Sequence, residues 1–443
     1  MSGKALVCKL HNISPIEGAD RIVRADLFNE TVITGINNVE GTIGLLFDCD
    51  TQLTPEYAAA NNMFRHSELN SDKTVVGYMD DNARVRPIKL KGVKCTALFM
   101  PLDTLEFIGG NVNDLSIGEQ IDEFCGVRIC NKYVTPETTK RLSQQQGVAY
   151  KKKRVPTFHE HFSTDQLQRN LHLIKEGSSI VVTEKLHGTS SRCGYLSVDV
   201  ADDVSKWFKW ISRMLGKIVG IDTSIYQEDS FVVGSRTVVK SIGDKTVKGE
   251  SYYKEDIWTE SAKRNFENKL HHGETVYYEI VGDLPNGSHI MPGHSSSKLE
   301  KFLDKEEYKN FVKTYGEHVL FSYGCKPSEY DIYVYRITMT NQDGVSIDLS
   351  WEQVKQRCQQ LGVKHVPEII SGIVDNHEAM IKILNVLRDS PSETFPDTVK
   401  EGICVRIDNG GFTPIILKDK TYVFKVLENI IKDLPSEDME EAN

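Results

Sequence analysis

The chain has 443 residues, of which 39% are hydrophobic and 26% charged, and its formal net charge is −10. This length exceeds what a single hydrophobic core usually supports, so we expect two or three globular domains. The negative balance excludes nucleic-acid binding through overall charge, because phosphate contacts need Lys and Arg. Any nucleic-acid site must be a local basic groove.

The cellular compartment is indicated by two further features. Nowhere do 18 apolar residues run together, and the first residues, MSGKALVCKL, contain no signal-peptide core. The nine cysteines are scattered without a CxxC pair, which indicates reduced thiols and not disulfides or structural zinc. We expect a cytoplasmic protein in a reducing compartment, without membrane contact.

Residues 1–126 show short apolar runs separated by turns, the pattern of an antiparallel β module. The order of SPIEGADRIVRADL, VITGINNVEGTIGLLF and KLKGVKCTALF resembles OB-fold domains that bind tRNA in some synthetases. The resemblance implies an N-terminal OB-like β-barrel. A barrel whose face binds protein, or binds nothing, is the alternative.

Residues 127–170 are interpreted as a connector, and residues 171–433 as an α+β domain with antiparallel sheets. The basic run 151–154 fits either a solvated loop or a nucleic-acid contact between two modules. Capping-box spacings, Ser350 with Gln353 and Asp375 with Glu378, predict helices at 351–361 and 376–389. The acidic tail, 434–443, is expected to fray.

The sharpest chemical signal is IVVTEKLHGTSSR at 180–192. A β-branched run ends at Lys185, so we expect this lysine to be partly desolvated, with a lowered pKa and a neutral amine able to attack phosphorus. Gly188 would let the backbone turn beside a ligand. Alone, however, K-x-x-G is a weak motif, and a surface lysine before a turn is the alternative.

The segments that follow give this motif its meaning: GSR at 234–236, YYEIVG at 277–282, DIYVYRI at 331–337, EGICVRI at 401–407 and LKDK at 417–420. In this order they resemble motifs I, Ia, III, IIIa, IV and V of the covalent nucleotidyltransferases, the superfamily of polynucleotide ligases and mRNA capping enzymes. The resemblance covers about residues 155–433. It implies an adenylyltransferase domain, the ATP-grasp-like catalytic domain of ligases.

The resemblance also implies roles for residues. Lys185 would attack the α-phosphate of ATP, Glu184 would read the adenine edge, and Gly188 would line the nucleotide site. Arg236 would bind ribose and phosphate through its guanidinium group. An ordinary surface arginine is the alternative for Arg236.

Two acids and an aromatic residue complete the implied nucleotide site. Glu279 would contact the ribose or a metal-bound water, with an internal salt bridge as the alternative. Glu401 would bind a divalent ion, Mg²⁺ or Mn²⁺, through oxygen. Tyr335 would stack on adenine, and Tyr333 competes for this role.

Motif V offers Lys418 and Lys420, which we expect not to face one phosphate together unless the strand twists. Lys425 competes for the role of the second lysine. Of these three lysines, the resemblance implies that Lys418 and Lys420 bind the nucleotide.

The architecture and motif I indicate which branch of the superfamily the chain resembles. E-K-x-H-G-T looks like RNA ligases, since DNA ligases usually carry Asp in place of His187. Only 23 residues follow Lys420, too few for the C-terminal OB domain of DNA ligases and capping enzymes. An N-terminal OB-like module is similar to Deinococcus-type RNA ligases, whose HxDTxQ-like lead-in resembles HFSTDQLQRN and makes Arg169 a substrate-contact candidate.

An insert at about 201–230 contains DDVSKWFKWISRMLGKIVG. Plotted as a helix, it has one apolar face and a mostly basic opposite face that includes Lys209 and Arg213. A helix docked on the domain with a solvated basic side is one interpretation. The other is that Lys209 and Arg213 contact the nucleic-acid substrate.

The sequence thus predicts an ATP-dependent RNA ligase that seals 3′-OH/5′-phosphate breaks through lysyl-AMP, in RNA nick repair. Its partner would be RNA or an RNA-containing nicked duplex, with no obligate protein partner. A DNA ligase or a GTP-dependent capping guanylyltransferase is the alternative enzyme. An RNA- or tRNA-binding scaffold with an inactive transferase domain is the alternative from another class.

Overall fold

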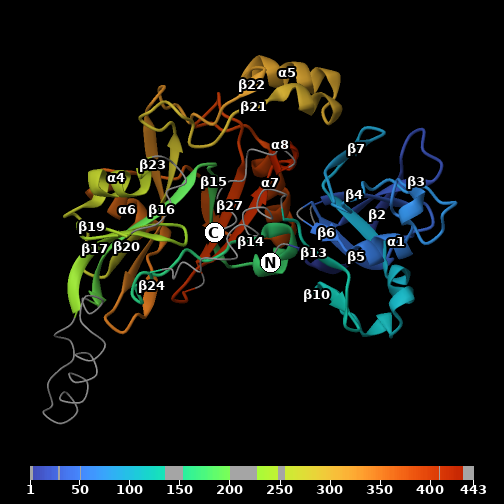
Figure 1. Ribbon diagram of the computed structural model, residues 1–443, viewed down its shortest axis with the longest axis horizontal. Coiled ribbons are helices and arrows are strands. Elements are labelled where there is room, and N and C mark those ends of the chain that lie inside the picture. The colour runs from blue at the N-terminus through green and yellow to red at the C-terminus, as the bar shows by residue number, and fades with distance from the viewer. Residues whose placement is uncertain are drawn as a thin grey trace, which may run out of the picture.

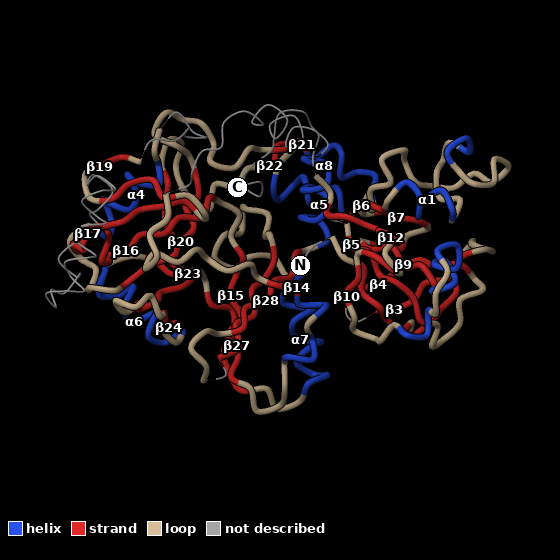
Figure 2. Tube along the Cα trace, turned by 60° about the horizontal axis from the view of Figure 1, so that its bottom comes forward, coloured by secondary structure: helices blue, strands red, loops and turns tan. Residues whose placement is uncertain are grey.

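The structure is a computed structural model, and it describes residues 3–27, 30–49, 51–134, 153–199, 227–247, 255–408 and 410–432. It has two parts: an N-terminal module at one end of the molecule and a larger module built on two sheets (Figures 1 and 2). Among the described residues no helix has the length and apolar character needed to cross a membrane.

The N-terminal module is built from short antiparallel strands. They are β1 (Ala5–Lys9), β2 (His11–Pro15), β3 (Ile22–Leu27), β4 (Glu30–Gly35), β5 (Ile43–Asp48), β6 (Thr51–Leu53), β7 (Ile88–Leu90), β8 (Val93–Cys95), β9 (Ala97–Pro101), β10 (Gln120–Ile121), β11 (Glu123–Phe124), β12 (Val127–Arg128) and β13 (Cys130–Lys132). One helix, α1 (Pro55–Ala60), begins where Thr54 caps it and Pro55 occupies the first turn.

The strand pairings of this module do not show the expected closed OB barrel. A four-stranded sheet has the order β10-β1-β5-β9 and a three-stranded sheet the order β2-β3-β4, and the described strands do not join these sheets into a ring. Strand pairing in this module also continues past residue 126, the expected boundary. Strand β13 pairs with β6, so the module extends at least to Lys132.

The larger module holds the remaining described strands and helices. They are β14 (Asp165–Gln166), β15 (Ser179–Lys185), β16 (Thr189–Asp199), β17 (Gln227–Ser235), β18 (Val239–Ile242), β19 (Lys245–Thr246), α4 (Ile257–Phe266), β20 (Glu274–Gly282), β21 (His294–Ser295), η8 (Ser296–Lys301, a 3₁₀ helix), α5 (Lys305–Tyr315), β22 (His318–Val319), β23 (Tyr330–Thr340), β24 (Ser346–Asp348), α6 (Trp351–Leu361), β25 (Lys364–His365), β26 (Glu368–Ile373), α7 (His377–Asp389), β27 (Gly402–Asp408), β28 (Ile415–Lys420) and α8 (Tyr422–Lys432).

Two sheets form the frame of this module. One has five strands in the order β14-β28-β27-β15-β26, and the other has eight, with β16, β20 and β23 at its centre. Except for the β14–β28 and β23–β25 pairs, the pairings are antiparallel, as expected. Strand β14 pairs with β28, so residues expected in the connector already belong to this module.

Strand β15 is buried on both faces, which explains its run of β-branched residues. Ile180 and Val182 pack in the core cluster beneath α7, while Val181 belongs to the large core shared with the eight-stranded sheet. A strand fixed from both sides holds its last residue, Lys185, in a defined position.

The two predicted helices are present. Helix α6 has the predicted bounds, and its capping box is complete, since the Ser350 hydroxyl accepts from the Gln353 amide and the Gln353 side chain accepts from the Ser350 amide. Helix α7 begins one residue later than predicted. Its cap is Asn376, whose side chain accepts from the Ala379 amide, and not the predicted Asp375.

The two modules are joined by polar contacts as well as by packing. The Arg169 guanidinium group lies 2.7 Å from Asp48 Oδ2, and Lys425 Nζ lies 2.5 Å from Glu30 Oε1. Helix α5 joins them a second time, because Lys89 contacts its cap residue Asp304.

Candidate active site

The Lys185–Gly188 turn carries the chain from one sheet to the other. Strand β15 of the five-stranded sheet ends at Lys185, and β16 of the eight-stranded sheet begins at Thr189. A Cβ on Gly188 would lie 2.2 Å from the Ile280 carbonyl oxygen. Only glycine therefore allows the turn to pass this close to β20.

Lys185 is held by a buried carboxylate. Its Nζ lies 2.7 Å from Oε1 of Glu401, a side chain that is only 2% exposed. The Nζ of Lys420 lies 3.3 Å from the same oxygen and 2.9 Å from Glu428 Oε1. Strand register explains the convergence, because Lys185 pairs with Gly402 on β27 and Gly402 pairs with Lys420 on β28.

The expected lowering of the Lys185 pKa is wrong for the ligand-free protein. Burial lowers the pKa of this amine, but Glu401 foremost, together with Cys404 and Glu279, raises it, and the net direction is upward. The charges of Lys185 and Lys420 in turn hold the pKa of Glu401 below its usual value, against the effect of burial. In this state Lys185 is an ammonium group and not a nucleophile.

Glu401 also has an unsatisfied oxygen. Among the described residues no hydrogen-bond donor reaches its buried Oε2, and the nearest recorded charged group is His187 Nδ1 at 3.9 Å. A buried carboxylate oxygen without a partner is costly, so this oxygen is suited to a cation. No group of three or more His, Cys, Asp or Glu suitable for a metal ion occurs within the described part of the chain.

Glu279 is the second acid at the turn. Its Oε1 accepts the Gly188 amide at 3.1 Å and its Oε2 accepts the Ser190 hydroxyl at 3.0 Å. Burial raises its pKa to about 7, although the nearby charge of Lys185 opposes this. This side chain is therefore fixed against the turn and titrates close to neutral pH.

The imidazole of His187 lies between Phe321 and Phe424, with ring centroids at 4.7 and 4.9 Å. Burial lowers its pKa to about 4, so the ring is neutral at pH 7. Its backbone amide donates to the Tyr323 hydroxyl at 2.6 Å. Aromatic packing thus fixes the residue that distinguishes this motif from the Asp of DNA ligases.

The two candidate tyrosines on β23 have different environments. A β-bulge lies between the pairs Tyr277–Arg336 and Tyr278–Val334, so Tyr335 is the extra residue and strict alternation fails. Its hydroxyl lies 3.4 Å from that of Ser190. Tyr333 packs edge-on against Phe395 in the core.

Three further predicted residues lie near this turn or on the strands beside it. Glu184 is 4% exposed and accepts the Ser392 hydroxyl at 2.7 Å, and burial raises its pKa. Arg236 comes directly after β17. Burial raises the pKa of Tyr335, and the charge of Arg236 opposes this effect. Burial raises the pKa of Cys404 to about 11, and the charges of Lys185 and Lys418 oppose this effect, so both lysines lie near this thiol.

Lys418 and Lys420 lie on the same face of β28, and whether both contact one phosphate stays a prediction. Residues two apart on a strand share a face, and the intervening Asp419 is buried on the other face, where Arg388 reaches it at 3.1 Å. Lys425, the proposed competitor, does not join this cluster. It pairs with Glu30 of the N-terminal module.

Arg169 does not lie in the site either. Its side chain is 5% exposed and its guanidinium donates to Asp48, Gln120 and the Lys4 carbonyl, which leaves it an intermodule contact. The other substrate candidates, Lys209 and Arg213, lie outside the described residues, as does most of the 201–230 insert.

Two residues that contact the Lys185–Gly188 turn or Glu279 were not predicted from the sequence. Ser190 lies two residues after Gly188, and its place inside HGTSSR is a signal that could have identified it. Tyr323 comes from a loop far along the chain, and no local pattern predicts that its hydroxyl accepts the His187 amide.

Comparison with known proteins bears on this arrangement. A family model described as RNA ligase matches residues 178–427, more than half of the chain. Among curated protein sequences none matches this chain. A Naegleria gruberi RNA ligase with PPi has a similar structure, with a TM-score of 0.56 and 16% identity over 95% of this chain and 97% of that one.

Mutant forms of the Naegleria gruberi RNA ligase are similar to the same degree. One with ATP and Mn has a TM-score of 0.55 and 16% identity, covering 95% of this chain and 98% of that one. Another with AMP and Mn has a TM-score of 0.55 and 15% identity, covering 95% and 97%. These likenesses show the fold, and the family match covers the turn, both acids and the lysines of β28, so the chain belongs to the RNA ligase family.

Proposed function

We propose that this chain is an ATP-dependent RNA ligase that joins a 3′-hydroxyl to a 5′-phosphate, with Lys185 as the residue that becomes AMP-linked. The observation that carries the proposal is the position of Lys185, at the end of a rigid strand and 2.7 Å from Glu401, a carboxylate with a free buried oxygen. The cations Lys418 and Lys420 share one face of β28. Such a group suits a triphosphate.

In the first step the Lys185 amine forms a bond to the α-phosphorus of ATP. The bond from that phosphorus to the bridging oxygen of the β-phosphate breaks, and pyrophosphate leaves with the electron pair. The amine must first lose a proton, which the pairing with Glu401 opposes. Nucleotide binding therefore has to be coupled to weakening of this pair.

The residues present fit a divalent cation at Glu401. Its Oε2 is a hard oxygen for which no donor is recorded among the described residues, and Glu279 supplies a second carboxylate beside Gly188. A bound Mg²⁺ or Mn²⁺ would offset charge on the triphosphate. Glu401 would then attract the Lys185 proton less, which favours the neutral amine.

The adenosine part would lie along β16 and β23. Tyr335 provides an aromatic face, Ser190 and Glu279 provide polar groups for the ribose, and Arg236 provides a phosphate or ribose contact. Glu184 presents a buried Oε1 for which no described donor is recorded, so it can accept from an exocyclic amine. Tyr333 would support this pocket from the core.

Two transfers would complete sealing. The RNA 5′-phosphate oxygen attacks the phosphorus of lysyl-AMP, the phosphorus–nitrogen bond breaks, and Lys185 is regenerated. A 3′-hydroxyl then attacks the activated 5′-phosphate, and AMP leaves. We propose that the substrate is a nick in an RNA-containing duplex, and that the N-terminal module is a divergent OB-like domain that helps to hold it.

Labelling with ATP tests the proposal. Wild-type protein incubated with α-labelled ATP and Mg²⁺ or Mn²⁺ should carry label after denaturation, and Lys185→Ala should carry none. Lys175→Ala, at an exposed lysine just before β15, is the matched control and should label normally. Label on the Lys185→Ala variant, or none on the wild type with either metal, would overturn the assignment.

Sealing assays then test the substrate. A nicked duplex with ribonucleotides at the 3′-hydroxyl end should be joined, and the same duplex with deoxyribonucleotides should be joined less efficiently. Equal joining of both nicks would remove the RNA preference and leave the adenylation step intact.

A further inference from the structure

A row of lysines follows one face of helix α5. Lys305, Lys309 and Lys313 are exposed and spaced by four residues, so they fall within an arc of about 80°. We call them the lysine stripe. The opposite face carries Phe311, which is buried, and Tyr315, which packs against the core.

The lysine stripe has one exposed acid beside it, Glu306, which lies three residues before Lys309. Within the described part of the chain no ion pair is recorded for any of the three, whereas Lys89 and Lys94 are each paired with an acid of this helix. Like charges four residues apart destabilise a helix. In a chain of net charge −10, a row that repels itself is suited to an anionic partner.

The position of α5 links the lysine stripe to the candidate active site. Its N-terminal end contacts the N-terminal module, since Lys94 Nζ lies 2.6 Å from Glu307 Oε1. At its other end, burial raises the pKa of Tyr315, and the charge of Glu184 contributes to the same shift. The helix therefore runs from the N-terminal module toward the side of the larger module where Glu184 lies.

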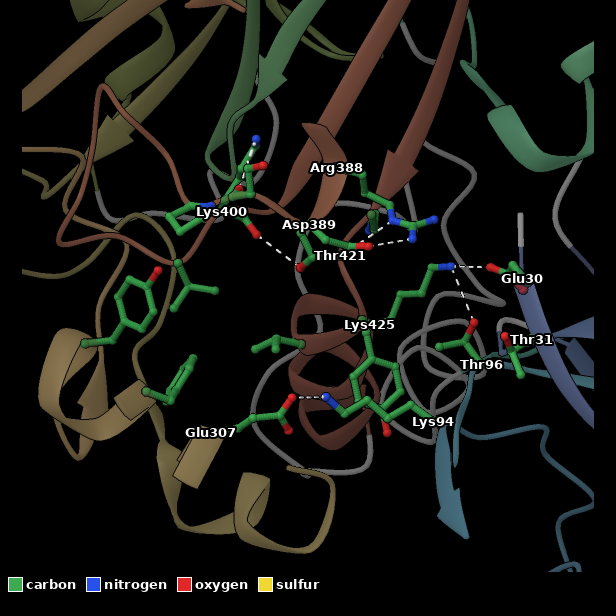
Figure 3. Close-up of a pocket in the computed structure, with 18 residues that line it drawn as sticks. Glu30, Thr31, Lys94, Thr96, Glu307, Arg388, Asp389, Lys400, Thr421 and Lys425 are labelled. Carbon is green, nitrogen blue, oxygen red and sulfur yellow. Dashed lines mark hydrogen bonds and ion pairs between the residues drawn. The ribbon is translucent and has the colours of Figure 1, made fainter. Parts of the chain in front are cut away.

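A cavity lies along the inner side of the same helix. It has a volume of about 510 Å³, and Glu307, Phe311 and Tyr315 form its wall on the α5 side (Figure 3). Lys420, which contacts Glu401, lines it too. The cavity thus extends from the contact between the modules to the lysine cluster of the site.

We propose that the lysine stripe binds the phosphate backbone of the RNA substrate along the outer face of α5, the helix whose inner face lines the cavity that reaches Lys420. This rests on the proposed function and adds the place where RNA lies. The three ammonium groups extend over about 12 Å of helix, a length that suits successive phosphates of one strand. Lys298 and Lys301 are two further exposed lysines on η8, the element that precedes α5.

The test compares two triple variants with equal changes in charge. Lys305→Gln with Lys309→Gln and Lys313→Gln neutralises the lysine stripe. Lys175→Gln with Lys269→Gln and Lys382→Gln neutralises three exposed lysines on other elements. Binding of a fluorescent nicked RNA duplex is measured by anisotropy over a range of salt concentrations, without ATP.

We expect the stripe variant to bind at least tenfold more weakly at low salt. The slope of log K against log salt should become shallower by about two to three, because each lost phosphate contact removes about 0.7–0.9. The control triple should keep the wild-type slope. Equal slopes for both triples, or an equal loss in both, would overturn the proposal.

Labelling with α-labelled ATP separates this inference from the proposed function. The stripe variant should form lysyl-AMP at the wild-type level, because no stripe lysine touches Lys185 or Glu401. If the wild type binds the RNA but takes no label, the ligase proposal fails while the stripe is still tested. If the stripe variant loses label as well, its lysines act on the site and not on RNA.

Discussion

The ammonium nitrogen of Lys185 lies 2.7 Å from Oε1 of Glu401, and this pairing raises the pKa of the lysine. Replacement of Glu401 by Gln removes the charge that favours the protonated form. In protein kept free of metal with a chelator, Lys185 should then react faster with an amine-specific reagent at pH 8. Mass spectrometry of the labelled peptide measures the rate of this reaction, which we expect to rise several-fold.

Glu428→Gln is the control for this prediction. Glu428 pairs with Lys420 and not with Lys185, so its loss should change the labelling of Lys185 little. The Glu401→Gln variant should also lose lysyl-AMP formation, because the carboxylate suited to a metal is gone. Unchanged reactivity of Lys185 in Glu401→Gln would show that burial, and not the ion pair, sets its pKa.

Gly188→Ala should damage both stability and activity. The added Cβ would meet the Ile280 carbonyl oxygen at 2.2 Å, so the turn or β20 must move, and with it Glu279. We expect the free energy of unfolding to fall by about 1–3 kcal/mol, measured by urea titration, with loss of lysyl-AMP formation.

Gly372 provides the contrast, since it lies on β26 beside β15 and a Cβ there would meet nothing within 4 Å. Gly372→Ala should change the unfolding free energy by less than about 0.5 kcal/mol. Similar losses in the two variants would mean that close approach at Gly188 is not the cause.

Tyr335 and Tyr333 can be separated by their effect on ATP. Tyr335→Leu removes the aromatic face at the bulge, and we expect the KM for ATP to rise about fivefold, since an aromatic pair contributes about 1 kcal/mol. Tyr335→Phe keeps the face and should stay within about twofold. Tyr333→Leu should lower stability through its core contact with Phe395 and leave the KM of the folded protein unchanged.

The sequence predicted best what depends on local pattern. The bounds of α6 followed from the capping box at Ser350, and the motifs that contain Lys185, Glu279 and Glu401 lie close together in the fold. Lys185 ends β15 opposite Gly402, the residue after Glu401, whereas Glu279 lies within β20 opposite Ser190, just after the turn at Gly188.

Features that depend on contacts between distant segments could not be predicted. The raised pKa of Lys185 depends on a carboxylate 216 positions away, just before β27, while the sequence shows only the burial that acts the other way. The intermodule contacts of Arg169 and Lys425 are equally non-local. Alternation along β23 failed as a guide because a bulge has no fixed signature in sequence.

Loss of the Arg169 contact should weaken the junction of the modules without harming the chemistry. Arg169→Ala leaves Asp48 without its partner, and we expect the free energy of unfolding to fall by about 2–4 kcal/mol, with normal lysyl-AMP formation. Arg128→Ala, which breaks an exposed pair with Asp122 in the N-terminal module, should cost less than about 1 kcal/mol. Loss of label in Arg169→Ala would instead place Arg169 in the reaction.

Glu368, on the strand beside β15, should make stability depend on acid. It accepts the Trp351 indole N–H at 2.7 Å and lies 2.8 Å from Lys355 Nζ. Although burial alone would raise its pKa, these contacts lower it to about 2. A depressed carboxyl pKa stabilises the folded state above the unfolded value of about 4.5, and this contribution is lost as the pH falls toward 2.

Glu368→Gln should therefore reduce the free energy of unfolding by on the order of 1–3 kcal/mol at pH 7, and the difference from wild type should shrink below about pH 4.5. Urea titrations across this pH range measure it. Glu352→Gln is the matched control, because Glu352 pairs with the same Lys355 at 2.7 Å but is 69% exposed, against 21% for Glu368. An exposed pair contributes at most about 1 kcal/mol. If the loss of unfolding free energy in Glu368→Gln stayed constant with pH, or equalled the loss in Glu352→Gln, neutral hydrogen bonds and not the charge of Glu368 would hold α6 to β26.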